Sequence, residues 1–314
     1  MSTATDPLSA VLTEVEAELR PSVRRVRDAE NRAQRLIDEL HRGGAWMYEV
    51  KEVLSHGSIS RGTGLRHFKD LDKLIVLDAE ALRTRRGAMR TPRDTISRMS
   101  RAIEDRRAGL VGLGSISIRS QDHSVGIRYR SGVRIDLVPA IRAGQRLLIP
   151  ESGSNEWLRT NPAETAGLLQ RAERRLPHAP AGVRLAKGWA RARGHHAPLP
   201  GYAIETLVVA SALREMLSLG ELVARFLADI AHSKISYRLV MGDGPVAGPI
   251  AVWDPVSDAN LTEELDKNHR KRLIEAARRG LEDLGRIEAT AAKGRHARAV
   301  SAARKLFLGS WADG

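Results

Sequence analysis

The chain has 314 residues, enough for one large domain or two smaller ones, and carries a net charge of +13 from 51 Lys and Arg against 38 Asp and Glu. It contains no cysteine, which excludes disulfides and thiolate metal sites, and no run of 18 uncharged apolar residues that would predict a membrane span. The first residues lack the basic start and apolar run of a signal peptide, so we expect a cytoplasmic protein without a membrane partner. The cation excess attracts polyanions such as nucleotides and nucleic acids. Only nine of the 51 cations are lysines, so the excess alone does not define a nucleic-acid-binding face.

The predicted elements divide the chain into a mixed α/β half and a helical half. A long helix is expected over residues 6–41, where Thr5 or Asp6 caps it and Pro21 kinks or restarts it. Strands are expected at 46–54, 71–78, 112–119, 124–130 and 133–138, with a helix near 94–108 between the second and third. Helices are expected at 162–176, 180–194, 201–216, 219–232 and 260–292, and the last dozen residues should be loosely held. The pattern therefore predicts an α+β chain with one domain over residues 1–160 and a helical domain over 161–314.

Two carboxylates stand one residue apart at the start of a very apolar predicted strand. Asp70 and Asp72 precede the run Leu74-Ile75-Val76-Leu77. Because side chains alternate in a strand, both acids project to the same face, where two like charges repel. A third acid, Asp136, lies within another apolar strand. If the two strands are neighbours, three carboxylates converge and can hold two Mg²⁺ ions, with Mn²⁺ as a substitute, for attack of a hydroxyl on phosphorus.

A Gly-Ser pair precedes these acids by eleven residues. Gly57 follows the predicted strand at 46–54 and lets the backbone approach a phosphate closely. The amides of the short helical turn that begins there, together with the Ser58 hydroxyl, can hold a triphosphate. A Gly-Ser pair alone is usually a turn and an Asp-x-Asp alone usually caps a loop. In combination with the third acid they form a specific constellation.

This constellation resembles the polymerase-beta-like nucleotidyltransferase superfamily, which carries a Gly-Ser pair followed by an Asp-x-Asp. Within it, the loop "GSISRGTG", the strand "IDLVPAI" and the segment "LLIPESGSNEWLRTNPAE" are similar to the branch that contains cyclic GMP–AMP synthase, 2′-5′-oligoadenylate synthetase and the bacterial CD-NTases of CBASS antiphage systems. The resemblance covers nearly the whole chain. It implies a mixed-sheet catalytic core followed by a helical domain that closes the nucleotide cleft. Lys73 departs from the usual apolar residue, but it points away from Asp70 and Asp72 and should leave catalysis intact.

The resemblance also assigns residues in the helical half. Lys187 matches the family's lysine that reaches the triphosphate, and Tyr202 matches a position that stacks on the base of the donor nucleotide. Gly201 replaces a serine that contacts phosphate in relatives. For Glu205, a helix-stabilising or domain-bridging role is expected. Asp254 and Asn260 should cap turns and the helix that begins near Leu261.

The activity implied is a Mg²⁺-dependent nucleotidyltransferase that joins NTPs, ATP or GTP among them, into a cyclic di- or trinucleotide second messenger with release of pyrophosphate. The product would act on a downstream effector during phage infection. Alternatives are a linear oligonucleotide synthetase or a template-independent RNA or tRNA nucleotidyltransferase, activated by nucleic acid bound to the arginine-rich first helix. We favour no nucleic-acid activator, since that helix fits a solvated spine. A silent nucleic-acid-binding scaffold and a toxin that modifies tRNA or protein are weaker alternatives.

The last residue, Gly314, permits one further hypothesis. Conjugation machinery of some antiphage operons attaches the synthase through its C-terminus, and a terminal glycine is compatible with this. A frayed chain end explains the same residue more simply. The sequence leaves the base specificity, the 2′-5′ or 3′-5′ linkage, the ring size and the oligomeric state open.

Overall fold

The computed structural model describes residues 6–42, 49–112, 114–121, 123–151, 154–232, 236–237, 250–257 and 259–309. These residues divide into two compact units, a helical unit and a sheet unit. The helical unit comprises residues 1–20, 62–66 and 163–314, and the sheet unit comprises residues 21–61 and 67–162. Gly314 lies outside the described residues. None of the described helices is long and apolar enough to cross a membrane.

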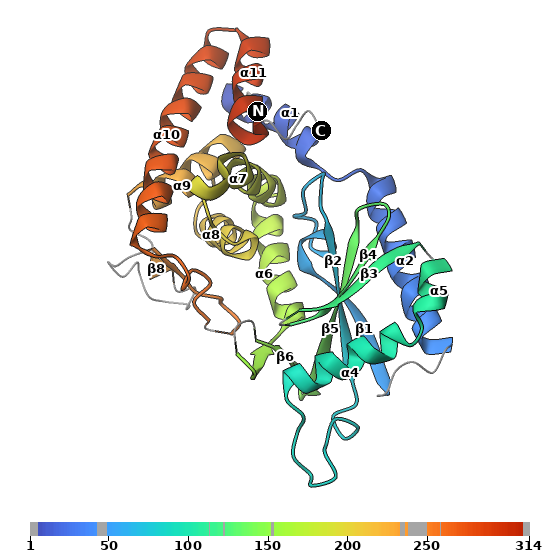
Figure 1. Cartoon of the computed structure of the whole chain (residues 1–314). Coiled ribbons are helices and arrows are strands. Elements are labelled where there is room, and N and C mark those ends of the chain that lie inside the picture. Colours follow the sequence, from blue (N-terminus) through green and yellow to red (C-terminus); the bar gives the residue numbers. More distant parts are fainter. Residues whose placement is uncertain are drawn as a thin grey trace. The chain divides into compact units, whose positions relative to one another are not determined.

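The sheet unit contains a mixed seven-stranded sheet (Figure 1). Its strands are β1 (Val50–His56), β2 (Asp70–Leu77), β3 (Ser115–Ser120), β4 (Val125–Tyr129), β5 (Arg134–Ala143), β6 (Arg146–Pro150) and β7 (Trp157–Thr160). The strand order is β1-β2-β5-β4-β3, and β6 and β7 extend the sheet from β5. Strand β2 pairs in parallel with β5, whereas β1 pairs with β2 and β4 pairs with β5 in antiparallel fashion.

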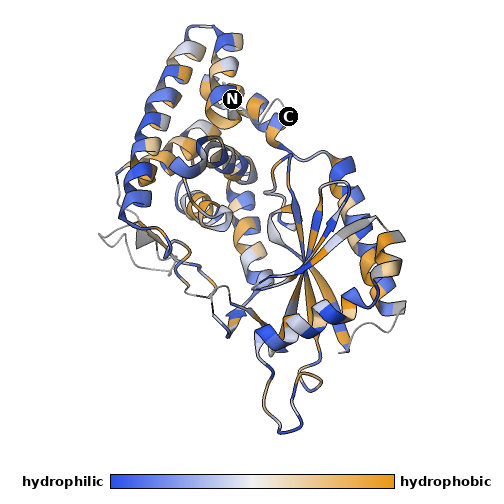
Figure 2. Ribbon diagram, viewed as in Figure 1, coloured by the Kyte–Doolittle hydropathy of each residue, from blue (hydrophilic) through white to orange (hydrophobic). Residues whose placement is uncertain are grey.

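Two helices cover one face of this sheet. They are α2 (Val23–Arg42) and α4 (Pro92–Glu104), and two shorter helices, α3 (Gly57–Ser60) and α5 (Arg107–Gly112), belong to the same unit. Ala33 and Leu36 of α2 and Ile96 of α4 pack in one core with Ile75 and Ile135 of the sheet. The opposite face carries a smaller cluster made by Leu74, Val76, Val138, Ala140 and Leu147. The strands are predominantly apolar in Figure 2, as strands with apolar side chains on both faces should be.

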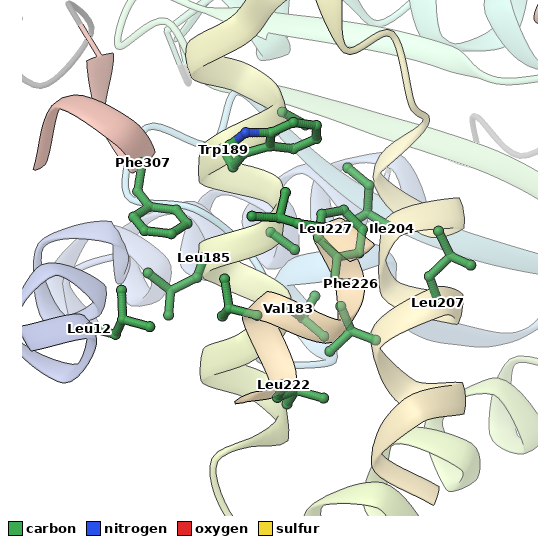
Figure 3. Packing of buried hydrophobic residues seen from close by; sticks show 14 of the residues in the cluster. Leu12, Val183, Leu185, Trp189, Ile204, Leu207, Leu222, Phe226, Leu227 and Phe307 are labelled. Carbon is green, nitrogen blue, oxygen red and sulfur yellow. The ribbon is translucent and has the colours of Figure 1, made fainter. Parts of the chain in front are cut away.

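The helical unit is built from seven helices and a short two-stranded ribbon within the described residues. The helices are α1 (Pro7–Leu19), α6 (Pro162–Arg175), α7 (Ala179–Arg193), α8 (Gly201–Arg214), α9 (Leu219–Ala231), α10 (Lys267–Ala292) and α11 (His296–Phe307), and the ribbon pairs β8 (Ser236–Tyr237) with β9 (Ala251–Val252). A single 3₁₀ turn, Gly194–His196, follows α7. Helix α7 lies at the centre: its Trp189 packs edge to face with Phe226, with ring centroids 5.8 Å apart, and Leu12 and Phe307 belong to the same core (Figure 3).

The structure differs from the sequence prediction in several elements. Pro21 interrupts the predicted helix over 6–41, because proline has no N–H and forces Arg20 into an extended conformation with ψ 137°. The two halves, α1 and α2, then belong to different units, so residues 6–20 and the segment 62–66 join the helices instead of the predicted domain over 1–160.

Elements later in the chain also differ from the sequence prediction. Strands β6 and β7 were not predicted, and the segment near 94–108 forms two helices, α4 and α5. Helix α10 begins at Lys267, after Asp266 caps it, and not near Leu261. The expectation of a loosely held chain end is wrong for the residues of α11, because Ala303, Leu306 and Phe307 are buried in the helical core.

Candidate active site

The three predicted acids lie on two neighbouring strands of the sheet unit. In the parallel pairing of β2 with β5, Asp72 stands directly opposite Asp136, and Asp70 stands directly opposite Arg134. Side-chain alternation places Asp70 and Asp72 on the face of Leu74, and Asp136 on the face of Val138, which is the same face of the sheet. The sequence prediction that the two strands are neighbours is therefore confirmed.

This arrangement concentrates negative charge in a partly dry environment. Asp136 is 3% exposed. Burial, together with the charges of Asp136 and Asp70, raises the pKa of Asp72 to about 6. Burial also raises the pKa of Asp136, an effect that the neighbouring Arg134 opposes. Two directly opposed carboxylates have no structural benefit of their own, so the pair indicates a site for a cation.

The Gly-Ser turn lies against this pair. Gly57 begins α3 with φ +80°, and a Cβ atom at this position would lie 2.1 Å from Oδ2 of Asp72. The turn therefore requires glycine twice, for its left-handed backbone and for the close approach of the carboxylate. Ser58 follows as the second residue of α3, and the Ser60 hydroxyl closes the turn by donating to the Gly57 carbonyl over 2.9 Å. The structure thus brings Gly57, Ser58 and Asp72 into one locality.

Arginine 134 contacts two of the three acids. Its Nη2 lies 3.0 Å from Oδ1 of Asp70 and 2.9 Å from Oδ2 of Asp136, and its Nε donates to the same Asp136 oxygen over 3.0 Å. The other oxygen of Asp136, Oδ1, accepts a hydrogen bond from Nε2 of Gln121 over 3.2 Å. Both oxygens of the buried carboxylate therefore have partners within the sheet unit.

Gly126 makes room for the contact between Gln121 and Asp136. It pairs with Asp136 across β4 and β5, and a Cβ atom there would lie 2.4 Å from Nε2 of Gln121 and 2.9 Å from Oδ1 of Asp136. Gln121 also lines a polar hollow of about 480 Å³, together with Arg93, Ser97, Ser120 and Asn155. That volume is in the range of small-molecule sites. Gln121 therefore both lines this hollow and contacts the third acid.

The donor set fits a divalent cation. Hard cations such as Mg²⁺ take carboxylate oxygens, and Asp70, Asp72 and Asp136 supply these from one face of the sheet. The raised pKa of Asp72 reflects a conflict of like charges that a cation would relieve. Among the described residues, however, no three His, Cys, Asp or Glu side chains are already arranged as a group that could hold a metal ion.

Lys73 lies on the opposite face of β2 from the acids, as the sequence predicted. It is 6% exposed, forms an ion pair with Glu30 of α2, and its Nζ donates to Oγ of Ser55 over 2.7 Å. The lysine therefore joins α2 and β1 to the sheet beneath the acids. A buried Lys surrounded by these partners is a structural feature.

Lys187 lies in the helical unit, on α7, in a buried polar cluster. Its Nζ is 3.0 Å from Oε2 of Glu205 on α8, and the same carboxylate oxygen accepts from the Thr63 hydroxyl over 2.7 Å. Lys187 also donates to the carbonyl and hydroxyl of Thr63. Glu205, for which we expected a structural role, is thus the buried counter-ion of the predicted triphosphate lysine.

Tyr202 lies at the start of α8, also in the helical unit. Its hydroxyl donates to Oδ1 of Asp254 over 2.9 Å. Asp254 also accepts from the amide of Val256 over 3.1 Å, and Oδ1 of Asn260 accepts from the amide of Thr262 over 3.0 Å. The predicted turn-capping roles of Asp254 and Asn260 are therefore confirmed. A cavity of about 20 Å³ beside Tyr202 has room for one water and none for a base.

Several residues that act on the acids were not predicted from the sequence. Arg134 could have been found, because it lies two residues before Asp136 in the same strand and so shares its face. Gln121 could not, since its contact depends on the turn between β3 and β4. Arg61 and His123 oppose the increase in the pKa of Asp72 through their charge, and they too come from turns.

Known structures share this fold over the full length of the chain. The chain is similar to the structure of CdnC with ATP from Escherichia coli MS115-1, with a TM-score of 0.74, 19% identity and 99% coverage of both chains. It is similar to the CD-NTase CdnG with GTP from Bradyrhizobium diazoefficiens, with a TM-score of 0.69, 14% identity, and coverage of 96% of this chain and 98% of the other. At the level of sequence, the chain is 23% identical over 252 residues to a "Cyclic AMP-AMP-AMP synthase" of Escherichia coli (strain MS 115-1), which covers 73% of this chain and 74% of the relative.

A family model decides the classification. The model of the Second Messenger Oligonucleotide or Dinucleotide Synthetase domain matches residues 7–172, more than half of the chain. This stretch contains the Gly-Ser turn, the opposed pair Asp72 and Asp136, and Arg134. The resemblance to CD-NTases, a mixed-sheet fold followed by helices, and nucleotidyltransferase character are thereby confirmed. The chain belongs to the family of Second Messenger Oligonucleotide or Dinucleotide Synthetases.

Proposed function

We propose that this protein joins NTPs into a cyclic oligonucleotide of two or three residues, with Asp70, Asp72 and Asp136 holding two Mg²⁺ ions and with pyrophosphate as the second product. The observation that carries the proposal is the directly opposed pair Asp72 and Asp136, of which Asp72 lies against Gly57 of the Gly-Ser turn. The names of the relatives support it, since one is a cyclic AMP-AMP-AMP synthase and others were solved with ATP or GTP.

The chemistry follows from the charges at the site. A hydroxyl oxygen of the acceptor nucleotide forms a bond to the α-phosphorus of the donor, the bond to pyrophosphate breaks, and the hydroxyl proton must leave. When bound, the divalent cations supply the positive charge that a triphosphate and its leaving pyrophosphate require. Asp136, whose pKa burial raises, is suited to receive the proton. The amides of α3 and the Ser58 hydroxyl donate hydrogen bonds to phosphate oxygens.

The helical unit contributes to binding in this proposal. Lys187 donates to the triphosphate, and Glu205 and Thr63 hold its side chain in one conformation. The ring of Tyr202, fixed through its hydroxyl to Asp254, offers a surface for the donor base. The polar hollow that Ser97 and Asn155 line includes Gln121, which contacts Asp136, and can receive the acceptor nucleotide.

The biological role follows from the relatives. A related Escherichia coli CdnC was solved in a complex named CdnC:HORMA-deltaN, so a protein partner of this kind is part of the proposal. We propose a cytoplasmic enzyme of an antiphage system whose product diffuses to an effector, with conjugation through Gly314 as a further hypothesis. The arginines exposed on α2, Arg24, Arg27 and Arg35, favour nucleic acid as the alternative activator.

Product analysis tests this proposal. The purified protein is incubated with the four NTPs and Mg²⁺ or Mn²⁺, with and without RNA or DNA, and the products are identified by mass spectrometry. We expect a cyclic product without a terminal phosphate, equimolar release of pyrophosphate per bond, and complete loss of both with EDTA. A linear product that keeps its 5′-triphosphate would support the linear synthetase instead. Nucleotides added to RNA would support the template-independent transferase.

A further inference from the structure

Arg134 occupies a particular place in the acid cluster. It stands directly opposite Asp70 in the pairing of β2 and β5, two residues before Asp136 and on the same face. Its guanidinium contacts both carboxylates, at 3.0 Å from Asp70 and 2.9 Å from Asp136. One cation of the protein therefore bridges two of the three acids that the proposed function assigns to metal ions.

The two contacts differ in strength. The Asp70 side chain is 48% exposed, and an ion pair with so exposed a partner contributes little. The Asp136 side chain is only 4% exposed and receives both Nε and Nη2 of Arg134. Charge-assisted bonds to a desolvated carboxylate are the strong kind. The pair with Asp136 is therefore the contact that a competing cation would have to replace.

The geometry points to Arg134 as a built-in counter-ion of the acid site, which a divalent cation must displace from Asp136 and Asp70 in order to bind there. This inference rests on the proposed function, because it assumes that the acids hold metal. It explains how the sheet tolerates the opposed carboxylates, because the guanidinium of Arg134 places a positive charge between Asp70 and Asp136.

Mn²⁺ binding to the full-length protein tests the inference directly. In Arg134→Gln, the backbone amide can still donate to the Lys69 carbonyl, as it does in the native strand over 2.7 Å, while the competing charge is gone. Calorimetry or electron paramagnetic resonance with Mn²⁺ alone should show binding about tenfold tighter than in the native protein, which corresponds to about 1.4 kcal/mol. The metal-free variant should melt at a lower temperature, and Mn²⁺ should raise its melting temperature by more than it raises that of the native protein.

Arg128→Gln is the matched control. Arg128 is exposed, lies on β4 directly opposite Arg134, and has no contact with the acids among those that the structure gives. If Arg134 acts through its contacts, Arg128→Gln should leave Mn²⁺ affinity within about twofold of the native value, because exposed charges are well screened. If both variants bound Mn²⁺ more tightly by the same factor, the net positive charge of the surface would explain the effect without the contacts of Arg134. This result would overturn the inference.

A second measurement covers the case in which Arg134→Gln does not fold. The ¹⁵Nε resonance of Arg134 is assigned by its absence from the spectrum of Arg134→Lys. Diamagnetic Mg²⁺ takes the place of Mn²⁺ in this measurement. The resonance of the native protein should shift between the metal-free sample and the sample saturated with Mg²⁺. An unchanged resonance, or an Arg134→Gln variant with unchanged or weaker Mn²⁺ affinity, would overturn the displacement. Failure of the native protein to bind Mn²⁺ at all would instead defeat the metal site of the proposed function.

Discussion

Asp72 and Asp136 face each other directly across the parallel strands β2 and β5, whereas the preceding pair on the same face, Asp70 and Arg134, has opposite charges. A sheet gains from the second kind of pair and loses from the first. Asp72 of the like-charged pair is also the residue that lies against Gly57 of the Gly-Ser turn. The stability of the sheet is therefore reduced at the position where the proposed chemistry needs negative charge, and the predictions below follow from this relationship.

Asp72→Asn should lower the rate of nucleotide joining by more than 100-fold. The loss of one metal-binding carboxylate removes several kcal/mol of transition-state stabilisation. Pyrophosphate release under saturating NTP and Mg²⁺ measures the effect. Asp78→Asn is the control, since Asp78 follows the same strand but pairs with Lys51 instead of the acid cluster. Near-native turnover by Asp72→Asn would defeat the assignment.

The pKa of Asp72 predicts a pH dependence of stability. Because this pKa is raised to about 6, the folded protein binds more protons than the unfolded chain between about pH 4 and pH 6. The free energy of unfolding of the metal-free protein therefore falls as pH rises through that interval, by about 1–3 kcal/mol from this group. Asp72→Asn should be more stable than the native protein at pH 7.5 and should lose this advantage at pH 4.5. Thermal unfolding in EDTA at both pH values measures the difference, and equal differences at the two would contradict the prediction.

Gly57→Ala should inactivate the protein. Two effects could cause this, strain in the backbone and a clash with Asp72, and a second glycine separates them. Gly57 and Gly132 both have φ +80°, so alanine costs about 1 kcal/mol of backbone strain at either position. Only at Gly57 would the new Cβ atom meet Asp72, 2.1 Å from Oδ2, whereas at Gly132 no atom lies within 4 Å. The backbone strain should lower the melting temperature of both variants by a similar amount. Turnover should be lost only in Gly57→Ala. Comparable activity in the two would show that the position of Asp72 relative to the turn is not needed.

The pair of Lys187 and Glu205 permits a test of the lysine's role. Lys187→Met leaves Glu205 buried without its counter-ion and should cost about 3 kcal/mol of stability. The double variant Lys187→Met/Glu205→Gln removes both charges and should recover most of that stability. If Lys187 donates to the triphosphate, the KM for NTP of the double variant should remain raised although its melting temperature recovers. Recovery of both would leave Lys187 with a structural role only.

Lys73→Met should lower the stability of the protein and leave its catalysis unchanged. The change removes the ion pair with Glu30 and the hydrogen bond to Ser55 beneath the acids, and should cost about 1–3 kcal/mol. Because Lys73 points to the other face of β2, kcat should stay within about twofold of the native value. Denaturant unfolding and steady-state kinetics provide the two measurements. Glu30→Gln leaves the buried Lys73 ammonium without its counter-ion and should be the more destabilising change. A large loss of kcat in either variant would tie the network to catalysis.

Much of the strand pair β2 and β5 could be predicted from the sequence. The apolar runs that contain Ile75 and Leu137 predicted strands because buried parallel strands are apolar on both faces. Alternation then placed Asp70 and Asp72 together and Lys73 on the opposite face. Helices α6 to α9 were predicted to within about two residues at each end, since their boundaries coincide with Pro, Gly and Ser.

Other parts depend on contacts between distant residues. Strands β6 and β7 are short and depend on pairing with other strands. Leu147 of β6 pairs with Arg142 of β5 on one side and with Thr160 of β7 on the other. Helix α11 does carry a periodic signal, with Ala299, Val300, Ala303 and Phe307 on one face, but small alanines make such a signal weak. The hydrogen bond from Thr63 to Glu205, the counter-ion of Lys187, could not be predicted, because these two residues are 142 apart in the chain.

The membership of α1 in the helical unit has a consequence during synthesis on the ribosome. This helix is translated before the sheet unit, yet the helices it contacts, among them α7, α9, α10 and α11, are translated after that unit. The sheet unit, which ends at residue 162, is complete while the apolar stripe of α1 still lacks its neighbours. Nascent chains stalled at residue 162 should therefore expose Leu12 and Val15 to chaperones, and this exposure should fall as α7, α9, α10 and α11 follow.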